Sequence, residues 1–296
     1  MQSAFTLPSF AKINWTLRVL GKREDGFHEL FTVFQTVSLH DTIHFAESDT
    51  LELTCNDPGV PLDERNLIIK AAQALQNMVG TAKSAAIHLE KRIPSPGGLG
   101  GGSSNAAVAL VGLKRLWGID IMDEELQPIA AGLGSDVPFF LQGGTALGTG
   151  RGEKIEPVGD VTEDYMLVVT PDVHVSTRDA FERLDAPTLT NADMDRILTV
   201  CRLEAKSRDF HRSVLINDFE ASVFAAYPEV ERVKEALLNL GAVNVAMSGS
   251  GASIFAIFDK EETRQAAIKA LDRESTWRKF AVATISRDKY REALGI

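Results

Sequence analysis

The segment Pro94–Asn105 (PSPGGLGGGSSN) carries the residue types best suited to binding phosphate. Its glycines have no Cβ, so backbone N–H groups can approach a ligand closely. A helix is expected directly after it, and the positive end of that helix would attract an anion to the same place. Ser103 and Ser104 add hydroxyls for a phosphate or a phosphate-bound Mg²⁺. The segment therefore predicts a phosphate-binding loop.

Two common nucleotide-binding motifs do not describe this loop. It lacks the Gly-Lys-Ser/Thr end of a Walker A loop and the GxGxxG spacing of a dinucleotide-binding fold. A flexible linker is another interpretation of so much glycine and serine, but a linker rarely lies between a tight strand and a strong helix. The expected order of strand, loop and helix favours anion binding.

Other candidate groups are weaker when each is taken alone. Asp136, in GSDVP, is either a turn or capping residue or a base or metal ligand. Lys12 lies in an expected strand, where an outward-pointing lysine is common. His28, in GFHEL, is compatible with an ordinary surface histidine. The turn Ser248–Ser253 (SGSGAS) fits a hairpin and a ligand contact about equally well.

The sequence offers no recognisable metal or hydrolase motif. Cys55 and Cys201 lie far apart, with no CxxC or Cys/His spacing, so neither a zinc site nor a disulfide framework is indicated. The remaining histidines show no metal-ligand spacing, and there is no GxSxG sequence. The sequence does not identify metal ligands.

Hydrophobic periodicity predicts the elements that position these groups. Alternating apolar residues indicate strands over 12–20 and 30–39, and shorter strands follow at 42–46, 51–55 and 85–93. Helices are expected over 66–79, 103–117 and 123–133, and the chain should return to an apolar strand by residue 141. Beyond an acidic stretch at 156–164, we expect strands at 165–170, within 244–258 and near 280–285, with helices at 177–184, 193–206, 217–224, 228–240 and 260–271.

Composition and charge exclude several classes of protein. The chain has 296 residues, of which 44% are hydrophobic, and its 31 Lys and Arg against 41 Asp and Glu give a net charge of −10. No apolar run approaches the roughly 18 residues of a membrane span, and the first residues do not resemble a secretory signal. A cytoplasmic protein without membrane or nucleic-acid partners is expected, because an acidic surface repels a polyphosphate backbone.

Taken together and in order, three segments resemble the GHMP kinases, the superfamily named for galactokinase, homoserine, mevalonate and phosphomevalonate kinases. They are the strand with Lys12, the loop Pro94–Asn105 and the turn Ser248–Ser253. The resemblance implies a two-domain α+β fold, with the active site in the cleft between the domains. Residues 1–158 would form an N-terminal, ribosomal-S5-like ATP-binding domain, and residues 159–296 a ferredoxin-like C-terminal domain on the substrate side.

The segments AKINWTL, DGFHEL, GLGGGSSN and GSDVPF narrow the resemblance to one branch of this family. Enzymes of that branch use ATP to phosphorylate the 2-hydroxyl of cytidine-diphosphate methylerythritol in the non-mevalonate route to isoprenoids. The match extends from residue 11 to about residue 286. Pro96 stands where a small residue is often found, and Phe27 where tyrosine is common.

The resemblance also implies roles for individual residues. Asp136 would be the catalytic base, with Lys12 beside it, and Mg²⁺ would bridge the ATP phosphates. ATP would be bound by Pro94, Ser95, Pro96, Gly97, Gly98, Leu99, Gly100, Gly101, Gly102, Ser103 and Ser104, with Asn66 and Lys91 near the adenine. The cytidine side would be formed by Asn14, Phe27, His28 and Phe181, while Gly249, Ser250 and Gly251 would close the substrate pocket.

Three alternatives remain open at this point. The chain could be another GHMP small-molecule kinase, such as a homoserine or mevalonate-type enzyme. It could be a non-catalytic nucleotide-binding regulator on the same fold, although that would not require both Lys12 and Asp136. It could also be an unrelated α/β protein whose glycine loops bind phosphate for another purpose. The sequence is compatible with a monomer and with a homodimer.

Overall fold

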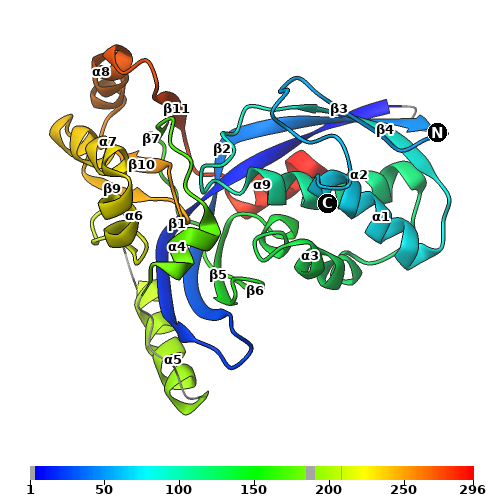
Figure 1. Cartoon of the computed structure of the whole chain (residues 1–296), viewed down its shortest axis with the longest axis horizontal. Coiled ribbons are helices and arrows are strands. Elements are labelled where there is room, and N and C mark those ends of the chain that lie inside the picture. The colour runs from blue at the N-terminus through cyan, green and yellow to red at the C-terminus, as the bar shows by residue number, and fades with distance from the viewer. Residues whose placement is uncertain (1–3, 185–190, 208) are drawn as a thin grey trace.

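The computed structural model describes residues 4–184, 191–207 and 209–296. In this part of the chain, the strands form one sheet of seven strands and one of four, and helices flank both (Figure 1). The predicted α+β class is confirmed. No helix among the described residues is both long and apolar enough to cross a membrane.

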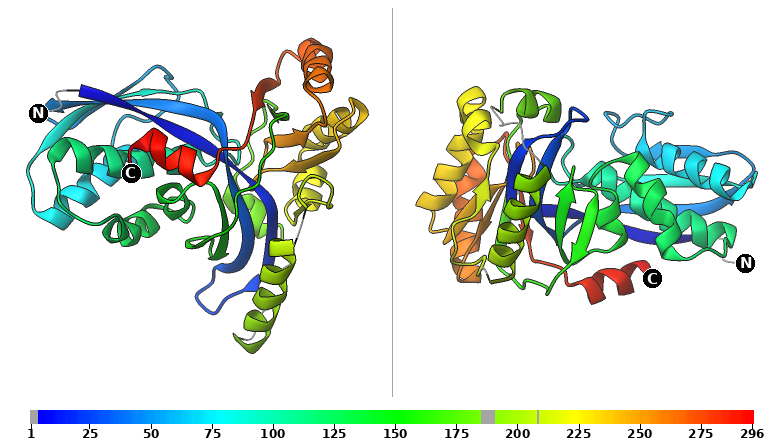
Figure 2. Two further views of the ribbon diagram at one scale, coloured as in Figure 1. Left: turned by 180° about the vertical axis from the view of Figure 1, so that it is seen from behind. Right: turned by 90° about the horizontal axis from the view of Figure 1, so that it is seen from below.

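The first sheet is built on a long antiparallel pair, β1 (Ala4–Lys22) and β2 (His28–Ser48). Its other strands are β3 (Glu52–Cys55), β4 (Ser84–Glu90), β5 (Thr145–Gly150), β6 (Lys154–Pro157) and β8 (Ile216–Asn217). One face is covered by α1 (Leu67–Val79), α2 (Gly101–Trp117), α3 (Gln127–Leu133) and α9 (Arg287–Leu294), as Figures 1 and 2 show.

The helix that follows the glycine loop is buried along much of its length. In α2, residues 104–111 are all buried and pack with Phe45, Ile87 and the apolar side of α1. Gly112 lies against the Phe45 ring, where a Cβ would come within 2.4 Å of a ring carbon. These contacts fix the start of α2 relative to the sheet, and so they fix the loop that precedes it.

The second sheet has the order β11 (Arg278–Val282), β7 (Met166–Thr170), β10 (Ile254–Ile257) and β9 (Asn244–Met247), all antiparallel. On its outer side lie α6 (Glu220–Ala226), α7 (Pro228–Asn239) and α8 (Glu261–Ala270), while α4 (Thr177–Glu182) follows β7. The helix α5 (Asn191–Ser207) lies beside the β1–β2 hairpin (Figure 1).

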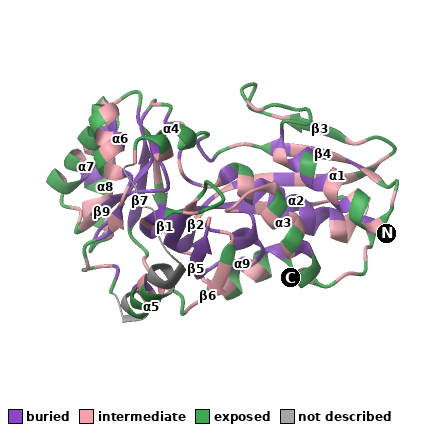
Figure 3. Ribbon diagram, turned by 60° about the horizontal axis from the view of Figure 1, so that its bottom comes forward, coloured by how far each residue is buried: buried purple, intermediate pink, exposed green. Residues whose placement is uncertain are grey.

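The inner face of the second sheet packs against the middle of β1 and β2. Trp15 stacks on Phe210, with ring centroids 5.7 Å apart, and meets the edge of Phe255 from β10. Figure 3 shows β1 and β2 coloured as buried where they lie beside the second sheet. The two halves of the molecule therefore share a hydrophobic core, and the long strands continue through both.

Several predicted elements differ in the structure: the strands expected at 30–39 and 42–46 form one continuous strand, β2, and the helix expected at 123–133 is a 3₁₀ segment followed by α3. Residues 138–141 form a short 3₁₀ helix, η2, and not a strand; the N–H of Phe140 donates to the carbonyl of Val137. The helix expected from residue 217 begins at Glu220, because Asn217 pairs with β1. The last strand ends at Val282, and the unpredicted α9 follows it.

The C-terminal helix packs with the N-terminal half of the chain. Tyr290 and Leu294 are buried in the core formed by α2 and the first sheet, and the Tyr290 hydroxyl donates to the carbonyl of Phe140 at 2.6 Å. The division at residues 158 and 159 stays a prediction. Two further 3₁₀ segments, η1 (Asp123–Leu126) and η3 (Leu271–Arg273), complete the described elements.

Candidate active site

A cavity of about 370 Å³ lies where the glycine loop, β1, β2 and the turn after β9 meet. Both residues predicted to be catalytic, Lys12 and Asp136, line it. The N-terminal half supplies the loop Pro94–Ser103, and the C-terminal half supplies Gly249 and Ser250. The predicted location in a cleft between the halves agrees with this geometry.

Lys12 and Asp136 form an ion pair at the wall of the cavity. The Lys12 ammonium lies 3.4 Å from Oδ2 of Asp136; 4% of the lysine side chain is exposed and 32% of the aspartate. Taken alone, Lys12 would be expected to point outward, but the structure buries it. A paired carboxylate that opens to a cavity can accept a proton from a bound hydroxyl.

Asn14 holds the other side of the Lys12 ammonium. Its Oδ1 accepts hydrogen bonds from Lys12 Nζ at 2.8 Å and from the backbone N–H of Gly249 at 2.9 Å. Its Nδ2 donates to the Thr32 hydroxyl at 2.7 Å. Asn14 lines the cavity, but its amide is already engaged with the protein.

The glycine loop is held firmly against the second glycine turn. Gly98 has φ +72°, and a Cβ there would come within 2.0 Å of the carbonyl oxygen of Ser248. The Ser248 hydroxyl donates to the carbonyl of Gly98 at 2.9 Å, and the N–H of Ser253 donates to the carbonyl of Gly97 at 3.2 Å. Only glycine fits at residue 98, so the loop is a fixed cradle and not a flexible linker.

The start of α2 presents backbone amides to the cavity. Gly101, Gly102 and Ser103 are its first residues and all three line the cavity. The first amides of a helix lack intrahelical acceptors, and with the helix dipole they attract an anion. Ser104 is placed differently: it is fully buried, and its hydroxyl accepts from Ser9 at 2.8 Å.

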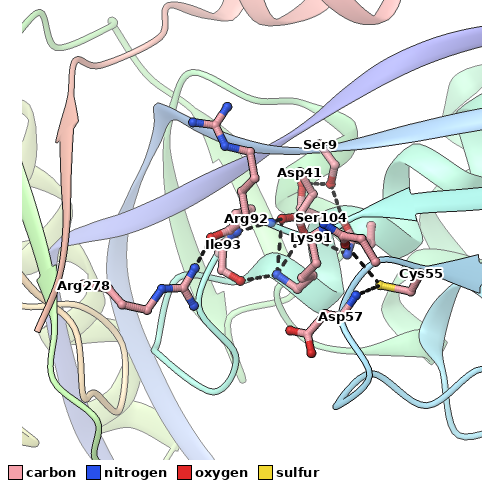
Figure 4. A network of polar contacts seen from close by, with 11 residues as sticks. Ser9, Asp41, Cys55, Asp57, Lys91, Arg92, Ile93, Ser104 and Arg278 are labelled. Atoms are coloured by element: carbon pink, nitrogen blue, oxygen red, sulfur yellow. Dashed lines mark hydrogen bonds and ion pairs between the residues drawn. The ribbon is translucent and has the colours of Figure 1, made fainter. Parts of the chain in front are cut away.

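The two residues predicted near the adenine are also engaged inside the protein. The Lys91 side chain is 5% exposed and pairs with Asp41 at 3.0 Å, in the network that Figure 4 shows. Burial lowers the pKa of Lys91, and the neighbouring Asp41 opposes that shift. Asn66 caps α1, its Oδ1 accepting from the N–H of Ile68 at 2.9 Å. Neither residue lines the cavity, and their contact with adenine stays a prediction.

Asp41 organises the entry to the glycine loop. Its carboxylate accepts hydrogen bonds from the backbone amides of Arg92 and Ile93 at 2.7 and 2.8 Å and from Asn105 Nδ2 at 3.1 Å. It thus joins the strand end before the loop to the helix after it (Figure 4). Sequence reasoning missed this residue, because an aspartate inside a strand gives no local signal of such a role.

A second cavity, of about 790 Å³, adjoins the first and contains the aromatic residues predicted for cytidine. Leu30, Ser135, Arg151 and Phe181 line both cavities. The rings of His28 and Phe181 stack with centroids 5.1 Å apart, and Phe27 is 52% exposed. Burial, together with the charge of Lys22, lowers the pKa of His28. A neutral imidazole offers one donor and one acceptor to a ligand.

Arg151 is a cavity residue that the sequence interpretation did not select. Its guanidinium lies over the Phe27 ring at 4.8 Å from the centroid, at the junction of the two cavities. The glycine-rich segment around it, GTGRGE, was the available signal. Of the turn residues predicted to close the pocket, Gly249 and Ser250 line the first cavity and Gly251 does not.

The chain itself offers few ligands for a metal ion. Among residues 4–184, 191–207 and 209–296, no three His, Cys, Asp or Glu side chains gather in a group that could hold one. Ser103 and Asp136 are oxygen donors at the cavity wall. This sparse set fits Mg²⁺, which commonly keeps several waters and binds through substrate phosphates with one or two protein oxygens.

The sequence matches known protein families over both halves. The family model described as "GHMP kinases N terminal domain" matches residues 66–144, and "GHMP kinases C terminal" matches residues 202–275.

Two similar proteins carry the same name. A 4-diphosphocytidyl-2-C-methyl-D-erythritol kinase of Chlorobium phaeobacteroides is 40% identical over 277 residues, which is 91% of this chain and 92% of that protein. The protein of the same name from Solibacter usitatus is 39% identical over 290 residues, 96% of this chain and 90% of its own.

Solved structures give the same picture of the fold. A 4-(cytidine 5'-diphospho)-2C-methyl-D-erythritol kinase superposes with a TM-score of 0.76 at 30% identity, over 95% of this chain and 99% of the other. A homoserine kinase from Cytophaga hutchinsonii superposes with a TM-score of 0.71 at 23% identity, over 97% and 96% of the two chains; this likeness concerns the fold alone.

Proposed function

The chain belongs to the GHMP kinases, and within that family we propose that it uses ATP to phosphorylate the 2-hydroxyl of 4-diphosphocytidyl-2-C-methyl-D-erythritol, in the non-mevalonate pathway to isoprenoids. The observation that carries this proposal is the Lys12–Asp136 pair, which opens into a cavity bordered by the glycine loop and continuous with the aromatic cavity around His28.

Asp136 serves as the general base. The 2-hydroxyl oxygen forms a bond to the terminal phosphorus of ATP while the bond from that phosphorus to the bridging oxygen of ADP breaks. The hydroxyl proton passes to the Asp136 carboxylate. An alcohol is a weak nucleophile near neutral pH, so a base positioned beside it accelerates the transfer.

Lys12 offsets the negative charge that develops at the reacting centre. Its ammonium lies 3.4 Å from the carboxylate, in a position fixed by Asn14. A cation that is held in place before the reaction needs no reorganisation as charge develops.

The loop Pro94–Ser103 and the start of α2 hold the ATP phosphates. The fixed backbone of Gly98 and the amides of Gly101 and Gly102 form the cradle. Ser103 and Asp136 would hold Mg²⁺ together with the phosphates, and the ion would supply charge neutralisation of the phosphate oxygens.

The second cavity receives the cytidine end of the substrate. The exposed face of Phe27 and the stacked pair His28–Phe181 provide aromatic surfaces for the base. Phe27 lacks the hydroxyl of a tyrosine but retains an aromatic ring for stacking, and the Arg151 guanidinium lies over one face of that ring. The predicted cytoplasmic location, the lack of nucleic-acid partners, and the choice between monomer and homodimer remain sequence-based predictions.

The test is ATP consumption with 4-diphosphocytidyl-2-C-methyl-D-erythritol, beside homoserine and mevalonate at matched Mg²⁺. Selective turnover of the cytidylated alcohol is expected. Turnover of homoserine or mevalonate in its place would still make the chain a GHMP kinase but would contradict the assignment of the second cavity to cytidine. ATP binding without turnover of any acceptor would favour a nucleotide-binding regulator.

A further inference from the structure

Residues 217–220 (NDFE) connect β1 to the glycine turn 248–251. Asn217 ends β8, which pairs in parallel with β1 at Leu17. The Asp218 carboxylate accepts a hydrogen bond from the N–H of Val19 at 2.8 Å. The Glu220 carboxylate accepts from the N–H of Met247 at 2.8 Å. This segment therefore attaches the strand that carries Lys12 to the turn that closes the cavity.

Within this segment, the Asn217 side-chain amide binds the turn directly. It is 6% exposed, and its Nδ2 donates to the carbonyls of Met247 and Gly249, each at 2.8 Å. Its Oδ1 accepts from the N–H of Phe219 at 3.0 Å. Both N–H donors and the carbonyl of the side chain are thus engaged, which fixes the orientation of the amide and the distance between the two carbonyls.

One oxygen, Asn14 Oδ1, links the same turn to Lys12. The N–H of Gly249 and the ammonium of Lys12 both donate to Asn14 Oδ1, at 2.9 and 2.8 Å. A Cβ built on Gly249 would lie 3.3 Å from Lys12 Nζ, so turn and lysine are in close contact. A shift of Gly249 would therefore disturb the hydrogen bonds of Asn14 that hold the Lys12 ammonium close to Asp136.

We propose that Asn217 is a positioning residue for phosphoryl transfer: it holds Gly249 so that Asn14 directs Lys12 toward Asp136. This inference rests on the proposed function. Asn217 does not line either cavity of the site, so it acts through Gly249 and Asn14 and not on the substrate. Misplacement of a catalytic group by about 1 Å costs on the order of 10²-fold in rate, which makes such a support consequential.

The test substitutes Asn217→Asp, which keeps the size and the acceptor for Phe219 but turns an oxygen toward two carbonyls. Asn244→Asp is the matched control. Asn244 begins β9, at the opposite end of that strand from the turn, and its Nδ2 also donates to carbonyls, among them that of Ser213 at 2.7 Å. Both variants lose comparable hydrogen bonds, so both should lose comparable thermal stability.

The positioning role predicts different kinetics for the two variants. We expect Asn217→Asp to lower kcat about 10- to 100-fold with the KM for ATP within about twofold of wild type. Asn244→Asp should keep kcat within about twofold. Equal losses of kcat in both variants, following their stability, would overturn the proposal, as would unchanged kcat in Asn217→Asp.

Labelling of Lys12 gives a readout that does not depend on turnover. Acetylation by an N-hydroxysuccinimide ester, measured by peptide mass spectrometry on the whole chain, should become several-fold faster at Lys12 in Asn217→Asp and remain unchanged in Asn244→Asp. The same rate in both variants contradicts the proposal. If the wild-type chain phosphorylates no acceptor, the proposed function fails, and this labelling ratio still decides the positioning role.

A poorly folding Asn217→Asp variant would not end the test. Asn217→Ser retains one donor and can be compared with Asn244→Ser by the same two measurements. A selective fall in kcat and a selective rise in Lys12 labelling are again expected for Asn217→Ser. Loss of that selectivity overturns the proposal.

Discussion

Lys12 and Asp136 form an ion pair in which the lysine is buried and the aspartate is partly exposed, and this gives the two residues different roles. A charge buried on its own is costly, and the Lys12 ammonium is paired with Asp136 and hydrogen-bonded to Asn14. The Phe34 ring lies 5.6 Å from the same ammonium. Asp136 is about one-third exposed, toward the cavity. The cation is thus held by the protein, while the carboxylate is free to meet a ligand.

Lys12→Met should lower kcat by about 10²- to 10³-fold, because one preorganised cation is lost from the reacting centre. Stability should change little, because an apolar chain of similar length replaces a buried charge while Asp136 remains accessible to water. Steady-state kinetics and thermal unfolding measure the two effects. Lys70→Met is the control, since Lys70 is exposed on α1. Retained turnover together with a large loss of stability would make Lys12 a structural residue.

Among the elements, the glycine loop depends most on a single backbone conformation. Gly98→Ala places a Cβ against the Ser248 carbonyl at a positive φ. We expect a loss of more than about 1 kcal/mol in unfolding free energy and a clear loss of ATP affinity. Urea unfolding and calorimetric titration with ATP measure these effects.

Gly159→Ala is the matched control for Gly98→Ala. A Cβ added at Gly159 would meet no atom within 4 Å, and this glycine has no positive φ. Its substitution should leave both ATP affinity and stability near wild type. Equal effects of the two substitutions would contradict the idea that the contact between Gly98 and Ser248 shapes the ATP site.

The glycine loop could be predicted because its signal is local: composition, a preceding strand and a following helix all lie within one stretch of sequence. The pairing of Lys12 with Asp136 could not, since their separation in the chain gives no periodicity, and only the family resemblance brought them together. The burial of Ser104 beneath Ser9 depends on packing between α2 and β1. Residues 138–141 form a 3₁₀ turn buried in the same core as Tyr290, and a short apolar run of this kind cannot be told from a strand by periodicity alone.

At the scale of the whole molecule, β1 and β2 give the two halves a common core, and the site lies where they meet. The net charge of −10 does not prevent binding of an anionic nucleotide, because helix amides and a buried lysine supply positive potential locally. The site therefore depends on the relative placement of the halves, which contacts outside the cavity also maintain.

His211 forms a contact within the C-terminal half that makes stability depend on pH. Its Nδ1 lies 2.9 Å from a Glu163 oxygen and its Nε2 lies 2.9 Å from Asp259. Hydrogen bonds to Glu163 and then Asp259 raise the pKa of His211. Because the folded pKa lies above the unfolded one, the contribution is fully present below about pH 6.5 and is lost as pH rises through the folded pKa.

Unfolding of wild type and His211→Gln in urea should show this dependence. The stability difference between the two is expected to be larger at about pH 6 than at about pH 9. Subtracting the variant removes the titration of other groups from the comparison. A difference that is constant over this range would show that His211 does not exchange its proton on unfolding as the contacts require.

The most direct test of the account is Asp136→Asn, assayed for ATP binding by calorimetry and for phosphorylation of 4-diphosphocytidyl-2-C-methyl-D-erythritol. The amide keeps the size of the carboxylate but cannot accept the hydroxyl proton. ATP affinity should stay near wild type, while kcat falls by about 10²- to 10⁴-fold. Near-normal turnover in this variant would contradict the assignment of Asp136 as the base and, with it, the proposed chemistry of the cleft.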